Sequence, residues 1–378
     1  MKLLVLTIDA FGGYGGIAQY NRDLLRALCE HPRVDDVVAI PRYVERYDET
    51  LPLKLRYVTS GVGGKLRYTR ACLRVLASSK RIDFIFCAHI NLLPLANFIG
   101  QLARCPVVPI VYGVEAWTPN RKWLINRACR SIKRFISIRA LTAQRFSRWA
   151  KLEDVHWDYL PNCIDTDVFK PMPKDASLIA RYGIANKTVV MAAGRLSDVP
   201  HEKFKGFDEI LDVLPDLRRE LPSVVYLIVG DGPDMPRLKA RANQIGVADI
   251  VIFVGRISAE DKPAHFCLAD VFAMPGSNRN FDRYPLRFVF LEALACGVPV
   301  VGSQADGSGE SHSPEGKLIV QVDPNDRNAI LHGILDALDA DRDGISRSVE
   351  PYNFESHRKR VIEIVDQLLS TTDSASAQ

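Results

Sequence analysis

Residues 188–232 read TVVMAAGRLSDVPHEKFKGFDEILDVLPDLRRELPSVVYLIVGDG, and this stretch holds the pattern from which the fold can be predicted. Two short apolar runs, residues 189–192 and 224–229, enclose a segment with helical periodicity at residues 207–220. Both runs are apolar throughout instead of alternating, which is typical of strands covered on both faces. A strand, a helix and a second such strand indicate a βαβ unit in a parallel sheet.

The same alternation extends outward from this unit in both directions. Helical patterns occur at residues 17–28 and 235–245, and short apolar runs lie between the helical segments. These further predicted strands are residues 3–8, 37–40, 84–87, 107–111, 135–138, 250–254, 271–274, 298–301 and 318–320. The chain is therefore predicted to be an α/β protein with doubly wound, Rossmann-like sheets.

The alternation breaks once, at residues 161–175, PNCIDTDVFKPMPKD, which are rich in Pro and Asp. The chain has 378 residues, and a single core rarely grows past about 250–300 residues. We therefore predict two domains, residues 1–165 and 174–350, facing a cleft at the carboxyl ends of their strands. Residues 351–370 are predicted to form a final helix and residues 371–378 a disordered tail.

The composition excludes several classes of protein. The net charge of +4 is small, and the hydrophobic fraction of 47% with 25% charged residues is ordinary for a globular protein. The eight cysteines contain no C-x-x-C pair, so we expect buried thiols in a reducing compartment and no metal site. The chain has no apolar run of about 18 residues, and its first residues read as a strand instead of a signal peptide. A cytoplasmic location is the corresponding expectation.

Glycines follow the first predicted strand in the loop of residues 11–17, FGGYGGI. Such a loop lets backbone N–H groups approach an anion at a helix N-terminus. The spacing is not G-x-G-x-x-G, and no acidic residue ends the second strand, which argues against a dehydrogenase. The loop either lies near a phosphate or sugar, or it is a tight turn that needs positive φ.

Charged side chains follow strands of the second domain. Arg195 and Lys205 both follow the first of these strands, and two cations beside a helix start suit a diphosphate, although solvated surface cations are the alternative. Glu292 lies in an otherwise apolar helical segment, where a carboxylate needs partners. Two ribose hydroxyls would supply them, and backbone capping is the alternative. The Gly230-Asp231-Gly232 sequence reads as a turn.

These motifs, taken together, resemble the family 4 retaining glycosyltransferases. The resemblance rests on Gly194-Arg195-Leu196 with Lys205-Gly206, on residues 229–232 and 291–300, on the linker at residues 161–169, and on Gly15-Gly16. It covers nearly the whole chain and implies the GT-B fold, with the donor in the second domain and the final helix returning to the first. No cofactor or metal is implied, because two cations neutralise the leaving diphosphate.

The resemblance also assigns roles to single residues. Arg195 and Lys205 would hold the diphosphate, Glu292 the ribose, and the backbone of Arg256 and Ile257 the base. Gly15 and Gly16 would lie over the phosphates, and His89 would face the sugar and act with the two cations as a catalytic group. Further donor-side residues implied are Asp282, Tyr284, Leu286, Arg287 and Phe288, and acceptor-side residues are Tyr14, Tyr112 and Glu115.

The sequence departs from the family pattern in the sugar half of the site. Tyr284 stands where the family has the first of two glutamates, and Pro285-Leu286-Arg287 replaces a Gly-Phe-Gly. Pro285 has no N–H, so one backbone donor to the sugar is lost. Asp282 or Arg283 would have to fill in. An unusual donor sugar, a different hydroxyl being bound and lost activity are the three alternatives.

Two stretches of the first domain are basic. Residues 119–151 carry ten Lys and Arg side chains and no acid, with Trp123, Leu124, Ile125, Phe146 and Trp149 among them, and residues 65–81 are also free of acids. A basic amphipathic surface suits an anionic membrane or acceptor, and a solvated basic face is the alternative. No nucleic-acid-binding motif accompanies these charges, so no nucleic-acid partner is predicted.

The sequence thus predicts a hexosyltransferase that moves a sugar from a UDP- or GDP-sugar to a glycan or lipid-linked acceptor in polysaccharide or glycolipid assembly. It would be peripheral on the inner face of the cell membrane. The alternatives are a non-catalytic nucleotide-sugar binder or membrane scaffold, and a GT-B epimerase.

Overall fold

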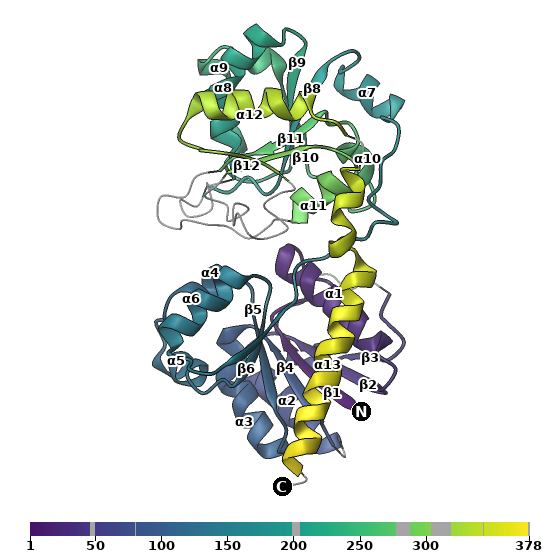
Figure 1. Ribbon diagram of the computed structural model, residues 1–378, viewed down its shortest axis with the longest axis vertical. Coiled ribbons are helices and arrows are strands. Elements are labelled where there is room, and N and C mark those ends of the chain that lie inside the picture. The colour runs from purple at the N-terminus through teal and green to yellow at the C-terminus, as the bar shows by residue number, and fades with distance from the viewer. Residues whose placement is uncertain are drawn as a thin grey trace. The chain divides into compact units, whose positions relative to one another are not determined.

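The computed structural model describes residues 1–45, 50–79, 81–198, 205–276, 288–303, 319–342 and 344–376. The chain divides into two compact units (Figure 1): unit 1 comprises Met1–Cys163 and Phe354–Gln378, and unit 2 comprises Ile164–Asn353. The first passage between them falls inside the linker predicted at residues 161–175, and the second brings the last helix into unit 1.

Unit 1 contains a seven-stranded sheet in the order β3-β2-β1-β4-β5-β6-β7. Every neighbouring pair is parallel. The strands are β1 (Lys2–Thr7), β2 (Asp36–Pro41), β3 (Leu55–Tyr57), β4 (Phe84–Ala88), β5 (Val107–Val111), β6 (Arg134–Ser137) and β7 (His156–Tyr159). β3 and β7 are absent from the prediction, because LRY and HWDY are short and only partly buried.

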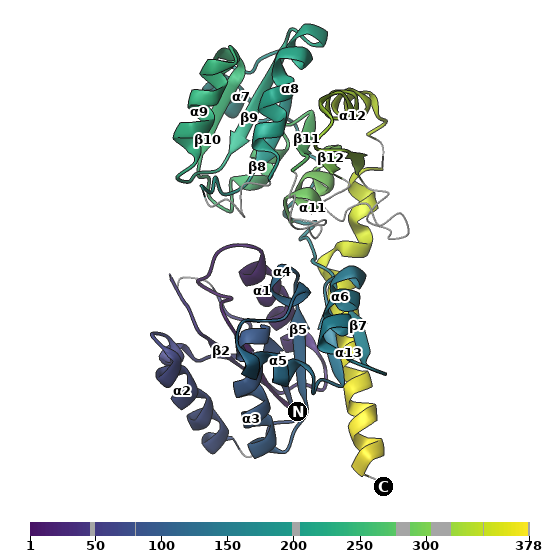
Figure 2. The same cartoon turned by 90° about the vertical axis from the view of Figure 1, so that its left-hand side faces the viewer.

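Helices connect these strands. They are α1 (Gly16–Glu30), α2 (Lys65–Ser78), α3 (Leu93–Ala103), α4 (Val114–Trp117), α5 (Trp123–Cys129) and α6 (Ala140–Ala150), with short 3₁₀ turns at Thr59–Gly61 and Ile90–Leu92. α2 contacts α3, and α3 contacts α5, so these three helices are neighbours. Figure 2 shows α2 and α3 side by side.

The last helix, α13 (Phe354–Ser376), packs along α1 in unit 1 (Figure 1). It includes residues 371–376, which the sequence analysis assigned to a disordered tail. The hydroxyls of Ser370 and Thr371 donate to the carbonyl of Gln367 at 2.8 and 3.0 Å. Polar side chains that bond back to the preceding turn are compatible with a helix, so the polar composition misled the prediction.

Unit 2 contains a six-stranded parallel sheet in the order β10-β9-β8-β11-β12-β13. The strands are β8 (Thr188–Ala193), β9 (Val224–Val229), β10 (Val251–Gly255), β11 (Val271–Met274), β12 (Val300–Ser303) and β13 (Val320–Val322). The helices are α7 (Ala176–Tyr182), α8 (Phe207–Glu220), α9 (Met235–Gln244), α10 (Lys262–Phe266), α11 (Phe288–Ala295) and α12 (Arg327–Asp339), with 3₁₀ turns at Ala248–Ile250 and Ser346–Tyr352.

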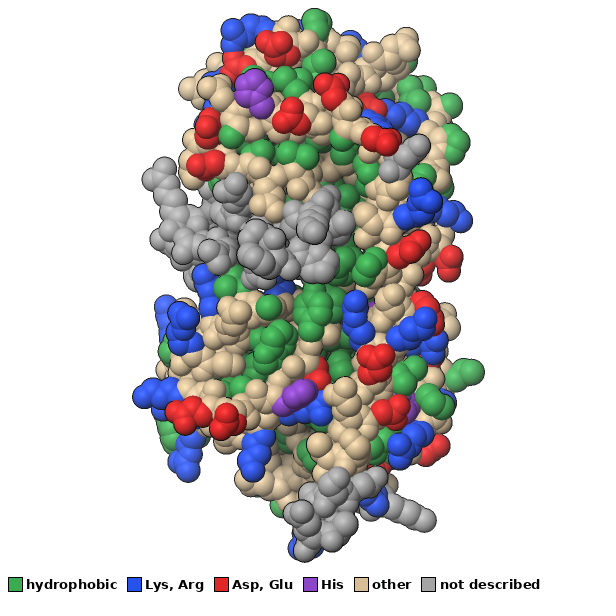
Figure 3. Space-filling view, viewed as in Figure 1, with side chains coloured by type: hydrophobic (Ala, Val, Ile, Leu, Met, Phe, Trp, Pro, Cys, Tyr) green, Lys and Arg blue, Asp and Glu red, His purple; other side chains and the backbone are tan. Residues whose placement is uncertain are grey.

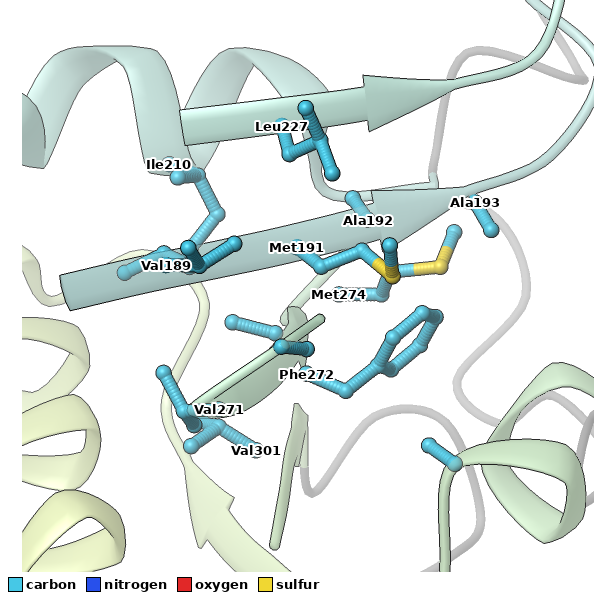
Figure 4. Close-up of a cluster of buried hydrophobic side chains, with 14 of the residues drawn as sticks. Val189, Met191, Ala192, Ala193, Ile210, Leu227, Val271, Phe272, Met274 and Val301 are labelled. Atoms are coloured by element: carbon cyan, nitrogen blue, oxygen red, sulfur yellow. The ribbon is translucent and has the colours of Figure 1, made fainter. Parts of the chain in front are cut away.

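The core of unit 2 lies where α8 covers the central strands. Val189 and Met191 of β8, Ile210 of α8, Leu227 of β9 and Phe272 of β11 pack together in it (Figure 4), each at most 1% exposed. The apolar runs of residues 188–232 are thus covered on both faces, as their sequence predicts. This packing holds the loops after β8, β9 and β10 at one edge of the sheet.

Candidate functional site

In unit 2, Arg195 and Lys205 lie near the carboxyl end of β8. The Lys205 ammonium donates a hydrogen bond to the carbonyl oxygen of Arg195 at 2.7 Å, while the Arg195 side chain is exposed. A Cβ atom built on Gly194 would lie 3.5 Å from Cδ of Lys205, so the lysine folds over this glycine. The structure therefore brings both predicted diphosphate ligands to one loop.

The Gly230-Asp231-Gly232 turn packs backbone to backbone against that loop. The N–H of Gly194 donates to Val229 at 2.9 Å, and the N–H of Leu196 donates to Asp231 at 3.0 Å. Cβ atoms built on Gly230 and Gly232 would lie 2.0 and 2.1 Å from carbonyl oxygens of the β8 loop, at Gly194 and Leu196. Both glycines are thus required by the close approach of two loops.

Arg256 and Ile257 follow β10 at the same edge. The N–H of Gly230 donates to the carbonyl of Gly255 at 2.9 Å, so this segment adjoins the 230–232 turn. The loops predicted to bind the diphosphate and the base therefore belong to a set of loops that follow three adjacent parallel strands, β8, β9 and β10. Asp282, Tyr284, Leu286 and Arg287 lie outside the described residues, and Phe288 begins α11.

Glu292 lies on α11 and is only 6% exposed. Its Oε1 accepts a hydrogen bond from the Lys262 ammonium of α10 at 2.8 Å. Its Oε2 is buried and has no hydrogen-bond partner among the described residues. A buried carboxylate oxygen without a donor is costly, and a ligand hydroxyl would satisfy it. Glu292 therefore makes an ion pair instead of the capping alternative, and its second carboxylate oxygen has no donor in the described parts of the chain.

Lys262 is a residue that the sequence reasoning missed. It stands in the segment Ser258–Lys262, which reads as a polar helix start, and its partner lies 30 residues away along the chain. A buried acid in an apolar helix signals that some cation is needed, but it does not indicate which one.

In unit 1, the glycine loop after β1 is a turn with positive φ at Gly12 and Gly15, and its proximity to a phosphate or sugar stays a prediction. A Cβ atom on Gly13 would lie 2.8 Å from Cβ of Asp9, so Gly13 is required by packing. Gly15 has φ 95° and precedes α1 without a side-chain cap, and no heavy atom lies within 4 Å of its built Cβ. The loop therefore presents uncapped backbone N–H groups beside Gly15 and Gly16. Tyr14 is 55% exposed.

His89 follows β4 at this edge of unit 1. Its Nδ1 accepts a hydrogen bond from the backbone N–H of Asn91 at 3.0 Å. Burial lowers the pKa of His89, and the nearby carboxylate of Glu115 opposes this shift. The ring is therefore neutral at pH 7 with its proton on Nε2, and it can donate a hydrogen bond but cannot accept a proton there.

Tyr112 and Glu115 are engaged inside unit 1. The Tyr112 hydroxyl donates to Oδ1 of Asn21 at 2.7 Å, and the residue is 5% exposed. Oε1 of Glu115 accepts from the N–H groups of Tyr112 and Gly113 at 2.7 and 3.1 Å. These contacts give both residues a structural role in the loop after β5. Contact with an acceptor stays a prediction for them.

Asp9, at the end of β1, is a second residue that the sequence reasoning missed. Its Oδ1 is buried without a hydrogen-bond partner among the described residues. Burial raises its pKa, and Arg22 opposes the shift. The signal in the sequence was an acidic residue directly after an apolar strand. Among the described residues, no group of three His, Cys, Asp or Glu side chains is placed to hold a metal ion.

The chain is similar to known proteins over most of its length. The family model described as Glycosyl transferases group 1 matches residues 187–340. The GDP-mannose-dependent alpha-(1-6)-phosphatidylinositol monomannoside mannosyltransferase of Mycolicibacterium smegmatis is 40% identical over 259 residues, 65% of either chain. The match thus spans less than two thirds of that enzyme. The Corynebacterium glutamicum enzyme for the monoacylated acceptor is 29% identical over 348 residues, 89% of either chain.

Solved structures agree on the fold. The Anabaena protein HepE in complex with UDP superimposes with a TM-score of 0.74 at 19% identity, over 97% of this chain and 100% of that one. At this identity the likeness concerns the fold alone. The two parallel-sheet units have the GT-B arrangement of strands and helices that the motifs implied.

Proposed function

We propose that the chain is a glycosyltransferase of the family 4, GT-B kind, and that it transfers mannose from GDP-mannose to a lipid-linked acceptor with retention of configuration. The relatives named above support the donor and the class of acceptor. The observation that supports this proposal most directly is Oε2 of Glu292, a buried acceptor that has no hydrogen-bond partner among the described residues, while Oε1 pairs with Lys262.

The donor side supplies binding and charge stabilisation. Arg195 and Lys205 would neutralise the diphosphate as it leaves, which is the main electrostatic requirement of the reaction. Glu292 would accept hydrogen bonds from the ribose, held in position by Lys262. Because two cations serve the diphosphate, we propose that no metal ion is needed, and activity should persist in EDTA.

The acceptor side supplies orientation. The bond from the anomeric carbon to the diphosphate oxygen would break while the acceptor oxygen bonds on the same face, and the acceptor proton would pass to the leaving phosphate. The neutral His89 would then donate from Nε2 to a sugar hydroxyl instead of acting as a base.

We also propose that unit 1 reaches its acceptor at an anionic membrane surface. On the neighbouring helices α2, α3 and α5, Leu66 is 81%, Phe98 49% and Trp123 65% exposed. Exposed cations accompany them at Arg67, Arg70, Arg74, Arg121, Lys122 and Arg127. Figure 3 shows Lys and Arg side chains along the edge of unit 1 that carries α4 to α6 in Figure 1. No helix among the described residues is long and apolar enough to span a bilayer.

The structure narrows the basic surface that the sequence suggested. Phe146 is fully buried, and Nε1 of Trp149 donates to the carbonyl of Ala116 at 2.6 Å. Arg134 pairs with Asp158, and Arg145 lies over the ring of Trp117. Much of residues 131–151 therefore packs within unit 1, because α6 turns its aromatic side chains to the core.

The donor proposal is tested by nucleotide binding. We expect GDP to bind more tightly than UDP or ADP in calorimetry and to raise the unfolding temperature, with and without EDTA. Arg195→Ala should abolish this effect. If no nucleotide binds the folded protein, the donor assignment is wrong.

A further inference from the structure

A cavity of about 930 Å³ lies in unit 1, away from the residues assigned above. Its floor is formed where strands begin, at Phe84 of β4, Val107 of β5, Arg134 of β6 and His156 of β7. In Figure 1 this is the end of unit 1 at which α13 ends. Gly15 and His89 follow the opposite, carboxyl ends of β1 and β4, so the cavity is not part of the acceptor side.

The walls of the cavity are mostly apolar. Leu368 of α13 and the segment that leads into β5 contribute to this lining, and the volume is within the range of about 300–1,000 Å³ typical of small-molecule sites. The apolar lining residues are Phe84, Cys105, Pro106, Val107, Val108, Pro109, Ile132 and Leu368. Such a surface can pack against one side of an alkyl chain.

The charged lining residues are all basic. None of the lining side chains among the described residues is acidic, while Lys133 and Arg134 contribute cations and His156 contributes an imidazole ring. Arg134 is neutralised by Asp158, with two contacts of 2.7 Å. Lys133 is exposed and makes no ion pair with any described residue, so its charge is available to a ligand.

Some of the uncharged polar lining residues are already hydrogen-bonded within the protein, and others are not. The hydroxyls of Ser131, Ser370 and Thr371 donate to nearby carbonyl groups. Asn97 and Gln101, on the face of α3 that lines the cavity, have no hydrogen bond from their amides to other described residues. Two amides and one ammonium therefore stand beside an apolar floor.

We propose that this cavity is a second binding site, for a single-chain anionic amphiphile whose phosphate or carboxylate contacts Lys133 and whose tail lies on the apolar floor. Apolar area would provide affinity, and the ammonium with the Asn97 and Gln101 amides would select the anionic head. The site is independent of the proposed glycosyl transfer, because it uses none of the residues assigned to donor or acceptor.

Calorimetric titration with dodecyl phosphate below its micelle concentration tests the proposal. One saturable site is expected, with no binding of inorganic phosphate and much weaker binding of dodecyl maltoside. Lys133→Glu should weaken binding about tenfold or more, since a hydrogen bond to a charged group contributes about 1.5–3 kcal/mol. Gln101→Trp should also weaken it, because the indole would occupy the part of the cavity next to α3 and the amide would be lost.

The matched controls are Lys187→Glu, on an exposed residue of unit 2, and Gln144→Trp, on an exposed residue of α6. Both should bind like the parent protein, and all four variants should keep the parent's circular dichroism spectrum and unfolding temperature, which shows that they fold. Equal binding of the maltoside, or binding that survives both Lys133→Glu and Gln101→Trp, would overturn the proposal.

Discussion

At the scale of single residues, the most informative atoms are buried polar atoms that lack a partner. The sequence indicated Glu292 because a carboxylate in an apolar helix needs partners, and within the described residues Oε1 has Lys262 as a partner and Oε2 has none. Asp9 could have been noticed as an acid directly after an apolar strand, but Lys262 could not be identified, because its importance depends on a contact between elements. The predicted sugar-side residues between 282 and 287 stay predictions, since they lie outside the described residues.

Glu292→Gln is the residue-scale test of the donor site. Losing the charged acceptor should weaken GDP binding about tenfold to a hundredfold, as expected for a hydrogen bond to a charged group. Calorimetry measures the affinity, and Glu260→Gln, at an exposed acid before α10, is the control. Equal affinity in Glu292→Gln and the parent would remove Glu292 from the site.

His89 is expected to act as a hydrogen-bond donor. Because its Nδ1 is occupied by the Asn91 N–H and its pKa is lowered, transfer rates should show no inflection from His89 between about pH 6.5 and 8. His89→Gln, which keeps a donor, should retain more activity than His89→Ala. Initial rates across this range provide the measurement, and a rate that depends on one deprotonation there would contradict the assignment.

At the scale of elements, the donor site depends on how closely two loops approach. The sequence predicted the Gly230-Asp231-Gly232 turn but not its contact with the loop after β8, because the two loops approach each other only when β8 pairs with β9. In the same way, periodicity predicted α1 but not its packing against α13. Tyr20 and His357, on these two helices, have ring centroids 5.9 Å apart.

Gly230→Ala should destabilise unit 2 and abolish GDP binding, because its Cβ would lie 2.0 Å from the carbonyl oxygen of Gly194. Gly246→Ala is the matched control. Gly246 also has positive φ, but no atom lies within 4 Å of its built Cβ, so only the backbone strain of about 1–3 kcal/mol applies. Scanning calorimetry and GDP titration compare the two. Similar losses in both would mean that the loop contact is unimportant.

The α1–α13 pair gives a pH prediction for unit 1. Burial lowers the pKa of His357 from 6.5 to about 4, so its stabilising contribution is present above pH 6.5 and is lost as pH falls toward 4. Burial raises the pKa of Asp23 from 3.8 to about 6, so its contribution is present below pH 3.8 and is lost as pH rises through 6. Each shift corresponds to about 3 kcal/mol, and the two oppose each other.

Relative to the parent, His357→Gln should therefore gain about 3 kcal/mol of stability between pH 6.5 and 4, and Asp23→Asn should lose a similar amount between pH 6 and 4. All four tryptophans lie in unit 1, so tryptophan fluorescence in urea reports this unit. Parallel pH curves for parent and variants would show that neither group is linked to folding.

At the scale of the whole molecule, the alternation of strands and helices was sufficient to predict two parallel-sheet units. Their central strands, such as Val224–Val229, are apolar because both faces are covered. The edge strand β7, with the sequence HWDY, lacks that signal. Charge patterning identified a basic stretch but not which cations are exposed, since ion pairs such as Arg134 with Asp158 form only in the fold.

The proposed binding to an anionic membrane is a property of the whole molecule. Unit 1 should bind vesicles of phosphatidylglycerol but not phosphatidylcholine, with affinity that falls as salt rises. Replacing Leu66 and Trp123 by Ser should weaken sedimentation with the anionic vesicles, whereas Val168→Ser, at an exposed residue of unit 2, should not. Undiminished binding of the double variant would exclude α2 and α5 as the membrane face.

The most direct test of the central claim is hexose transfer itself. The protein is incubated with GDP-[³H]mannose and vesicles that contain phosphatidylinositol monomannoside, in the presence of EDTA. We predict that label appears in the lipid, and that Arg195→Ala and Lys205→Ala abolish it while both variants remain folded. Full activity in both variants, bound donor that is never transferred, or donor converted without any acceptor would contradict the account.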